Sequence, residues 1–467
     1  MNNIPLTIKE TQDGLLKKEY SAVELVNGYL DKINKNKDLN GFLTLCENEA
    51  YSKAKNIDKL IATEDPNLVN DFPLLGATVG HKDLFLTKGV RTTAASKVLE
   101  SYIPQYSGTA VLRMDKAGSI MLGKTNCDAW AHGASGENSD FGSTKNPWNK
   151  KYVPGGSSSG SAASVAAGLS LIATGTDTGG SIRQPANFCG IVGLKPTYGV
   201  VPRYGVIAMA SSLDTVGSFG RSVSDVETVF NVIRGEDGFD STVKNHSFLK
   251  PKDKMKIGIP KEYFVEGTDK EVAENVKKVS KVFEKAGIEV IEVSLPNTKY
   301  AISVYYIVQP AEVSSNLGRY DGIRFGNSRA DFGSEAKRRI MLGTYVLSAG
   351  YYDAYYLKAQ KVRSRLINDF DNVFDKVDAI LAPVSPTPAF KLGEKKEDPL
   401  KMYLADIFTA SANLAGIPGL AVPSGFNSEK LPLGFQILGP KFSEQILFKL
   451  GNLYEKETSF KPELPNL

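Results

Sequence analysis

A stretch of small residues from Gly155 to Arg183, GGSSSGSAASVAAGLSLIATGTDTGGSIR, limits how this chain can fold. It begins and ends with Gly-Ser turns, it has no charged residue before Asp177, and nothing bulkier than Leu or Ile lies between Ser157 and Ala173. So little side-chain volume allows two backbones to approach closely, which is a common reason for glycine at a given position. Its Gly and Ser content favours a buried helix and turn over a membrane span. We expect the rest of the chain to be organised around it.

The composition is that of an ordinary globular protein. The 467 residues are enough for two domains or one extended α/β domain, and 42% hydrophobic and 23% charged residues are usual values. A net charge of +4 is too small to argue for a nucleic-acid ligand by itself. Three cysteines (Cys46, Cys127 and Cys189) have no CxxC spacing, and the first residues include no apolar signal segment. We therefore expect reduced thiols, a cytoplasmic location and no membrane association.

Short apolar runs broken by glycine alternate with helical periodicity along most of the chain. Ser21 and Glu24 form a capping-box pattern at the start of a helix within the helical segment 1–65. Further helices are expected over 223–233, 269–286 and 300–367, and strands over 255–259 and 288–293. This alternation predicts an α/β fold with a mixed sheet.

We predict one domain, 1–467, made of three parts. N-terminal helices occupy 1–65, a sheet-centred core covers about 66–240 and 370–467, and a peripheral helical lobe covers about 250–370. Polar, weakly patterned residues at 240–254 suggest the loop by which the chain enters that lobe.

Three histidines, His81, His132 and His246, give little support to the commonest catalytic arrangements. No GxSxG elbow follows a clear strand, so an ordinary Ser-His-Asp hydrolase is not indicated. His81 and His132 have no partner at metal-ligand spacing, and we therefore expect no metal site. The glycines match neither the dinucleotide nor the P-loop pattern. Of the catalytic arrangements considered, one remains: a serine nucleophile with a base other than histidine, which is a known variant of the triad.

Two runs, GGSSSGSAA and GTDTGGSIRQPANFCGIVGLKPTYG, closely resemble the amidase signature family. The resemblance implies the amidase signature fold, in which helices cover both faces of a mixed central sheet. It also implies a Ser-cisSer-Lys catalytic group. Matched residue by residue, Ser181 is the nucleophile, Ser157 is the bridging serine held by a cis peptide bond after Gly156, and Lys82 is the base.

The chemistry of this group is physically consistent. A serine hydroxyl is a weak nucleophile until a neighbouring base takes its proton. Lys82 can do so only when it is neutral, so we expect burial to lower its pKa well below the free value of about 10.4. The glycine-rich turn leaves the backbone N–H groups of Thr178, Gly179, Gly180 and Ser181 free to face an oxyanion. Loss of one such donor typically costs about 10²–10³ in rate.

Other stretches resemble one branch of the family, the glutamine-hydrolysing A subunits of glutamyl-tRNA(Gln) amidotransferases. These stretches are SLPNTKYAI (294–302), SSNLGRYDGIRFG (314–326), KRRIMLGT (337–344), GYYDAYYLKAQKVR (350–363) and NLAGIPGLAVPSG (413–425). The resemblance implies that this chain hydrolyses glutamine and supplies ammonia for the amidation of Glu-tRNA(Gln) to Gln-tRNA(Gln). It implies a heterotrimer with subunits B and C, in which B makes the main contacts with Glu-tRNA(Gln). ATP and Mg are then used by the assembled complex, and this chain has no cofactor of its own.

The same resemblance implies a glutamine site. A free amino acid needs a cation for its α-carboxylate and an anion for its α-ammonium. Arg339 and Asp406 would supply these charges, and Tyr305 would line the pocket. In the alternative interpretation Arg339 is a helix-surface arginine beside Arg338, and Asp406 only caps or pairs with its own helix. We predict that the tyrosines of GYYDAYY pack in the core rather than touch a ligand.

Two departures from the family pattern stand out. The run KTNCDAWAHGASG has Ala129 in place of an acidic residue and His132 in place of an apolar one, which bears on pocket polarity or ammonia exit. The segment 326–337 is shorter than the family pattern, which bears on partner contacts there.

A stand-alone amidase acting on aliphatic or aryl amides is the alternative function. Such an enzyme would have an apolar tunnel in place of the pair Arg339 and Asp406. A role in binding alone would leave Lys82, Ser157 and Ser181 without a use.

Overall fold

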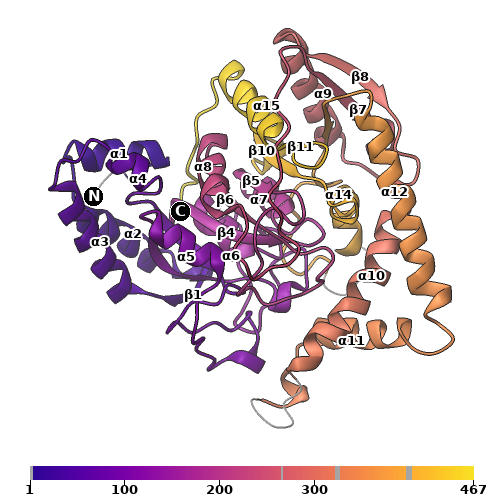
Figure 1. Ribbon diagram of the computed structural model, residues 1–467, viewed down its shortest axis with the longest axis horizontal. Helices are drawn as coiled ribbons and strands as arrows, with labels where there is room; N and C mark the ends of the chain where they lie inside the picture. The colour runs from indigo at the N-terminus through magenta and orange to yellow at the C-terminus, as the bar shows by residue number, and fades with distance from the viewer. Residues whose placement is uncertain (1–3, 265–266, 321–326, 396–401) are drawn as a thin grey trace.

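One mixed β-sheet forms the centre of the molecule (Figure 1). The computed structural model describes residues 4–264, 267–320, 327–395 and 402–467. The strands of these residues lie in the order β1-β3-β2-β4-β6-β5-β10-β11-β9-β7-β8. Their bounds are β1 Phe42–Leu45, β2 Thr78–Lys82, β3 Ile120–Thr125, β4 Ile172–Asp177, β5 Val192–Lys195, β6 Thr215–Gly220, β7 Lys256–Pro260, β8 Glu289–Val293, β9 Ala379–Ala382, β10 Gly419–Phe426 and β11 Pro432–Leu438.

Parallel and antiparallel pairs are mixed in this sheet. β2 is parallel to both β3 and β4, and β7 is parallel to both β8 and β9. The other six neighbouring pairs are antiparallel. Parallel neighbours need long crossover connections, and helices supply them here, as with α5 between β2 and β3. The predicted α/β fold with a mixed sheet is confirmed.

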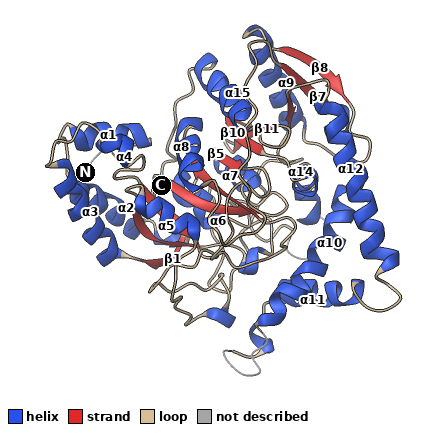
Figure 2. Ribbon diagram, in the orientation of Figure 1, coloured by secondary structure: helices blue, strands red, loops and turns tan. Residues whose placement is uncertain are grey.

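Helices cover both faces of the sheet (Figure 2). α8, α9 and α15 pack on one face, α6 and α7 pack on the other, and α10 packs against α11 and α12. The helix bounds are α1 Ile8–Leu16, α2 Ala22–Lys35, α3 Glu47–Ile61, α4 Leu68–Asp71, α5 Thr109–Lys116, α6 Ser159–Ala166, α7 Arg183–Cys189, α8 Val223–Ile233, α9 Lys270–Lys285, α10 Ala301–Asn316, α11 Ser334–Val346, α12 Lys358–Phe374, α14 Ala410–Ala415 and α15 Glu444–Glu457.

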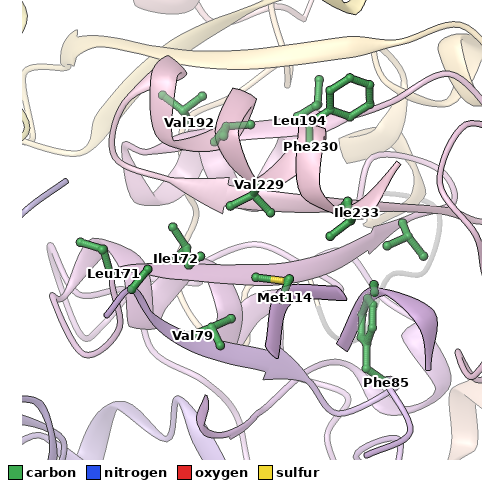
Figure 3. Packing of buried hydrophobic residues seen from close by; sticks show 14 of the residues in the cluster. Val79, Phe85, Met114, Leu171, Ile172, Val192, Leu194, Val229, Phe230 and Ile233 are labelled. Carbon is green, nitrogen blue, oxygen red and sulfur yellow. The ribbon is translucent and has the colours of Figure 1, made fainter. Parts of the chain in front are cut away.

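The two faces of the sheet are packed differently. Leu420 and Val422 of β10 belong to the large core on the α8 side, whereas Ala421 between them belongs to a small-residue cluster with α6 and α7. Figure 3 shows the large core, in which Val79 of β2 and Phe230 of α8 are among the labelled side chains. The face that α6 and α7 cover is thus packed mainly by small side chains.

Helix α6, from the stretch of small residues, is buried along its whole length, as predicted. A Cβ on Gly160 would lie 2.4 Å from Gly41 O and 2.5 Å from Asn126 N, so no side chain fits at this position. The N–H of Gly160 also donates to Asn126 O over 2.9 Å. The start of α6 is therefore held directly against the chain that follows β3.

The elements expected at 255–259, 269–286 and 288–293 are found as β7, α9 and β8 to within one residue. The helical segment expected over 300–367 is divided among α10, α11 and α12, and α12 continues to Phe374. The Ser21–Glu24 capping box forms at the start of α2, and α8 spans the predicted residues. Residues 250–370 contribute β7 and β8 to the sheet as well as α9–α12, and the division into three parts stays a prediction. The three cysteines are buried and free. Within the described residues, no helix is both long and apolar enough to cross a membrane.

Candidate active site

Lys82 is the last residue of β2, and its side chain is fully buried. Its Nζ lies 2.8 Å from Ser157 Oγ, 3.0 Å from Ser158 Oγ and 2.8 Å from Thr176 Oγ1. Burial lowers the pKa of Lys82 to about 8, although nearby carboxylates partly oppose this shift. The neutral amine that the predicted mechanism needs is therefore accessible near neutral pH.

Ser157 lies just before α6, and the peptide bond from Gly156 to Ser157 is cis, as the family resemblance implies. Gly156 packs on Asp128, because a Cβ there would lie 2.1 Å from Asp128 Oδ2. The N–H of Asp128 donates to Ser157 O over 3.1 Å, which fixes the backbone on the other side of the cis bond. Burial raises the pKa of Asp128 to about 7 despite two backbone N–H donors.

The turn that holds Ser181 connects β4 to α7, and a buried ion pair anchors it. Arg183 Nε and Nη2 donate to the carboxylate of Asp177 over 3.1 and 3.2 Å. The same carboxylate accepts the N–H groups of Ile182 and Arg183. Burial raises the pKa of Asp177, but Arg183 and these hydrogen bonds outweigh it and lower the pKa to about 2. Asp177 is thus a structural anion that shapes the turn.

Inside this turn the backbone donors stay available. Thr409 Oγ1 donates to Gly179 O over 2.6 Å, and the N–H of Gln184 donates to Gly180 O over 2.8 Å. The N–H groups of residues 178–181 donate to no described residue. This arrangement fits the predicted oxyanion hole of Thr178, Gly179 and Gly180.

Ser181 is 8% exposed, the most accessible of the three predicted catalytic residues. Its C=O accepts the N–H of Ser158 over 3.3 Å, which ties the turn to the start of α6. Among the described residues, no hydrogen bond joins Ser181 Oγ to Ser157 Oγ. Catalytic hydrogen bonds are often long in ligand-free sites and shorten when substrate binds. The structure thus joins Lys82 to Ser157 directly and places Ser181 next to them.

Tyr305 and Asp406 border the turn from the α10 side. Tyr305 is buried, and a Cβ on Gly179 would lie 2.6 Å from its Cζ atom. Asp406 is also buried, in the short helix η9 (Leu404–Asp406), and a Cβ on Gly180 would lie 3.4 Å from its Oδ1 atom. Burial raises the pKa of Asp406 to about 8, and Arg339 partly opposes this shift.

Arg339, on α11, points inward and is buried, whereas its neighbour Arg338 is exposed. Its Nε donates to Glu335 Oε1 over 2.8 Å, and its Nη1 donates to Gln309 Oε1 over 3.0 Å. The guanidinium also lies 5.4 Å from the ring centre of Tyr306. The interpretation of Arg339 as a surface arginine is therefore wrong.

A cavity of about 250 Å³ lies beside Arg339. It is lined by 133–135, Glu137 and Asn138 and by residues of α11, together with Tyr306, Lys395, Met402 and Tyr403. Asp406 and Ser181 do not line this cavity. Tyr306 lines it and also contacts Asp406, because the Oη atom of Tyr306 lies 3.5 Å from Asp406 Oδ2.

The two departures from the family pattern fall near this cavity. His132 is fully buried, and neither ring nitrogen has a partner among the described residues. Burial and the charge of Arg339 lower the pKa of His132 well below its usual value, so the ring is neutral. Ala129 is buried nearby in the chain. The shorter segment 326–337 is described from Asn327 onward, and the DGIRFG match (321–326) lies outside the described residues.

Sequence reasoning missed several residues that the structure brings into the site. Ser158 and Thr176 complete the hydroxyl groups around Lys82, and Glu335 and Gln309 hold Arg339. Ser158 lies in the run GGSSSGSAA and Thr176 in the run GTDTGGSIR. Their closeness in sequence to Ser157 and Ser181 could have pointed to a place beside Lys82. Glu335 stands four residues before Arg339 on one helix, a spacing that favours an ion pair. In the described part of the chain, no group of three or more His, Cys, Asp or Glu side chains could hold a metal ion.

Comparisons with known proteins agree with this geometry. A model of the Amidase family matches residues 24–448. The A subunit of glutamyl-tRNA(Gln) amidotransferase from Carboxydothermus hydrogenoformans is 50% identical over 99% of both chains. Its counterpart from Coxiella burnetii is 48% identical, also over 99% of both chains. A crystal structure of the corresponding protein from Thermotoga maritima covers 97% of this chain and 94% of its own, at 40% identity and a TM-score of 0.81.

The family model covers most of the chain, including all residues placed in the site. A crystal structure of an amidase at 27% identity and a TM-score of 0.82 has the same fold over 97% of this chain. The chain therefore belongs to the amidase signature family.

Proposed function

We propose that this chain is the glutamine-hydrolysing A subunit of glutamyl-tRNA(Gln) amidotransferase. It hydrolyses glutamine to glutamate and ammonia, and the ammonia serves to convert Glu-tRNA(Gln) to Gln-tRNA(Gln). The observation that carries the proposal is the contact of buried Lys82 with Ser157, beside the turn that holds Ser181. The 50% identity to a relative of that name, over nearly the whole chain, supports the choice of substrate.

In the mechanism, Ser181 Oγ attacks the carboxamide carbon of glutamine. Its proton passes to Ser157, and the proton of Ser157 passes to the neutral amine of Lys82. The N–H groups of Thr178, Gly179 and Gly180 stabilise the oxyanion. The proton then returns through Ser157 to the leaving nitrogen, and ammonia departs from the acyl-enzyme. Water, activated by the same pair, releases glutamate and restores Ser181.

Arg339 and Asp406 provide the two charges that a free amino acid needs. The Nη2 atom of Arg339 donates to no described residue and is available to the α-carboxylate, while Glu335 and Gln309 hold the other two nitrogens. The α-ammonium would stabilise the ionised form of Asp406, whose pKa burial raises to about 8. Tyr305 would lie along the substrate chain.

The proposal includes partners. The relatives are named as one subunit of a larger enzyme, which supports an assembly. This chain would work in a cytoplasmic heterotrimer with subunits B and C, and Glu-tRNA(Gln) would be contacted mainly by B. ATP and Mg would be used by the assembled enzyme, with no cofactor in this chain.

The test compares kcat/KM for glutamine and for butyramide, a neutral amide without α-groups, with subunits B and C present. Loss of one partner of a desolvated charge pair costs roughly 2–5 kcal/mol. Arg339→Ala should therefore weaken use of glutamine about 30- to 4000-fold and barely change use of butyramide. Lys281→Ala, at an exposed position of α9 outside the site, is the control and should leave both values unchanged.

Three results would contradict this function. Equal losses on both substrates would make Arg339 a structural residue. A wild-type preference for butyramide would point to a stand-alone amidase. Activity that survives Ser181→Ala would remove the assigned nucleophile.

A further inference from the structure

Exposed hydrophobic side chains gather on one part of the surface. Of nineteen large hydrophobic side chains that are exposed in the described chain, seven lie between Met341 and Tyr355, and Met341 is 72% exposed. We call the exposed side chains of 341–355 the α11 patch. In Figure 1, α11 and the chain after it lie at the lower right edge of the molecule, far from the N-terminal helices. Such clustering, unlike single exposed residues, marks an interaction surface.

One face of α11 packs against α10. The side chains on the opposite face of α11 are therefore held at the molecular surface. A Cβ on Gly343 would lie 1.8 Å from Pro310 O, which shows how closely the two helices pack. Arg339 bonds to Gln309 of α10 on the same inner side. The patch cannot turn inward without breaking these contacts.

Tyrosines form the centre of the α11 patch. The ring centres of Tyr345 and Tyr351 are 4.3 Å apart, and those of Tyr351 and Tyr355 are 6.0 Å apart. The prediction that the tyrosines of GYYDAYY pack in the core is wrong for Tyr351, Tyr352 and Tyr355, which are exposed. Rigid aromatic groups and methionine are enriched at the centres of protein interfaces.

The charges around the patch are mainly of one sign. The exposed basic residues near it in the sequence are Lys337, Arg338, Lys358, Lys361 and Arg365, and the exposed acidic ones are Asp331 and Asp353. Arg338 is paired with Glu335 of its own helix, so four of the five basic side chains are left for a partner. A second copy of this chain would bring like charges together, because a symmetric contact pairs a surface with itself. A partner with an acidic rim would be attracted.

A protein fits this surface better than RNA does. Tyr345, Tyr351 and Tyr355 contact one another in mostly tilted pairs, so they form one aromatic cluster and not a row of separate rings on which successive bases stack. Met341 and Leu342 are aliphatic and exposed, and they offer apolar area with no stacking capacity. The basic rim alone would suit either partner.

We propose that the α11 patch docks a different protein chain with an apolar contact face and an acidic rim. This rests on the proposed function, and the partner is then one of the companion subunits of the amidotransferase. The surface lies on the helix that also carries Arg339, so docking takes place on the outer side of the substrate site.

The test measures the affinity of the purified full-length chain for the purified B–C pair by calorimetry. Met341→Glu and Tyr351→Glu each place a negative charge in the patch, opposite the expected acidic rim. Each should weaken binding at least about 30-fold, as for a residue at the centre of an interface. Leu112→Glu, at an exposed position of α5, is the control and should bind as the wild type does. Unchanged hydrolysis of butyramide shows that each variant is folded.

The remaining outcomes overturn the proposal. If both patch variants bind B–C as tightly as the wild type, the patch is not the docking surface, and the proposed function survives. If the wild-type chain does not bind B–C, the partnership in the proposed function fails with it, while the glutaminase assay stands independently. If the variants keep B–C binding but lose affinity for Glu-tRNA, or turn a wild-type dimer into monomers, the surface belongs to RNA or to a second copy.

Discussion

At the scale of single residues, the surroundings of Lys82 on β2 differ from those of Lys124, a buried lysine on the neighbouring strand β3. Burial lowers the pKa of Lys124, and the carboxylate of Asp83, whose Oδ1 lies 3.6 Å from Lys124 Nζ, partly opposes this shift by favouring the charged form. Lys82 Nζ is surrounded by hydroxyl groups instead, and no carboxylate of the described chain lies within ion-pair distance. Hydroxyl groups can accept from an ammonium or donate to an amine, so they allow both protonation states. This is the environment that a proton-transfer lysine needs.

The first prediction is a pH dependence. Because Lys82 must be neutral to accept a proton and its pKa is about 8, kcat/KM for butyramide should rise with pH through about 8 and then level off. A neutral substrate keeps the titration of Asp406 and of the glutamine ammonium out of the profile. Lys82→Arg should be inactive at every pH, because a guanidinium keeps its proton. A flat profile, or an active arginine variant, would require another base.

The second prediction concerns Thr176, which the sequence did not single out. Thr176→Val removes one acceptor from the ammonium of Lys82, and a hydrogen bond to a charged group contributes about 1.5–3 kcal/mol. The pKa of Lys82 should fall, so the rising limb of the butyramide profile should move about one pH unit or more toward acid. Thr174→Val is the matched control, because Thr174 Oγ1 contacts the backbone N–H of Lys82 instead. If both variants shift the limb equally, the hydroxyl of Thr176 has no specific effect on the amine.

At the scale of elements, the site depends on short helices held very close to strands. α6 starts against Asn126 after β3, and the turn before α7 is fixed by the pair Asp177 and Arg183. Arg183 also bonds to Asn413 of α14 over 2.6 Å, which ties the turn to the C-terminal half of the chain. Small residues allow the start of α6 to lie close to Asn126. The turn before α7 is stabilised by a buried ion pair whose polar atoms are hydrogen-bonded.

The third prediction tests this close approach. Gly160→Ala adds a methyl group within 2.4–2.6 Å of Gly41 and Asn126 backbone atoms, which cannot move aside easily. Although alanine favours helices, overpacking typically costs about 1–3 kcal/mol, so the midpoint of urea unfolding should fall. Gly318→Ala is the control, because nothing lies within 4 Å of a Cβ there. An unchanged midpoint for Gly160→Ala would mean that α6 can shift without cost.

At the scale of the whole molecule, the site joins distant parts of the chain. Lys82, Ser157 and Ser181 come from β2, the approach to α6 and the turn after β4, while Arg339 and Asp406 come from α11 and η9. The sheet order places β2 next to β4, and α10 brings Tyr305 onto Gly179. A ligand that touches both groups should therefore stabilise the chain as a unit.

The fourth prediction measures this linkage. In Ser181→Ala, which cannot turn glutamine over, glutamine at about 100 times its Kd should add about 2.7 kcal/mol of stability and raise the thermal midpoint. The double variant Ser181→Ala, Arg339→Ala should lose this rise, because the carboxylate partner is gone. A rise of equal size in both proteins would place the ligand away from Arg339.

The catalytic motif could be predicted from the sequence because its chemistry is local. The signals are glycines that permit a tight turn, serines at the ends of a small-residue helix and the resemblance to one family. They lie in contiguous letters and together point to Ser157 and Ser181, whose catalytic roles stay predictions. The capping box of α2 and the periodicity of α9 are local for the same reason. Lys82, far away in the chain, was placed by the family resemblance.

Burial and distant partners depended on the tertiary structure. Nothing in the letters around Arg339 shows that it points inward to Gln309 while Arg338 points out, because that choice depends on how α11 packs on α10. In the same way, three tyrosines of GYYDAYY, Tyr351, Tyr352 and Tyr355, lie exposed although the run has the composition of a core, whereas Tyr356 packs against a buried cluster. The hydrophobic pattern of a sequence indicates which side chains tend to be buried. Whether such a side chain is in fact covered depends on how the helices and strands pack together.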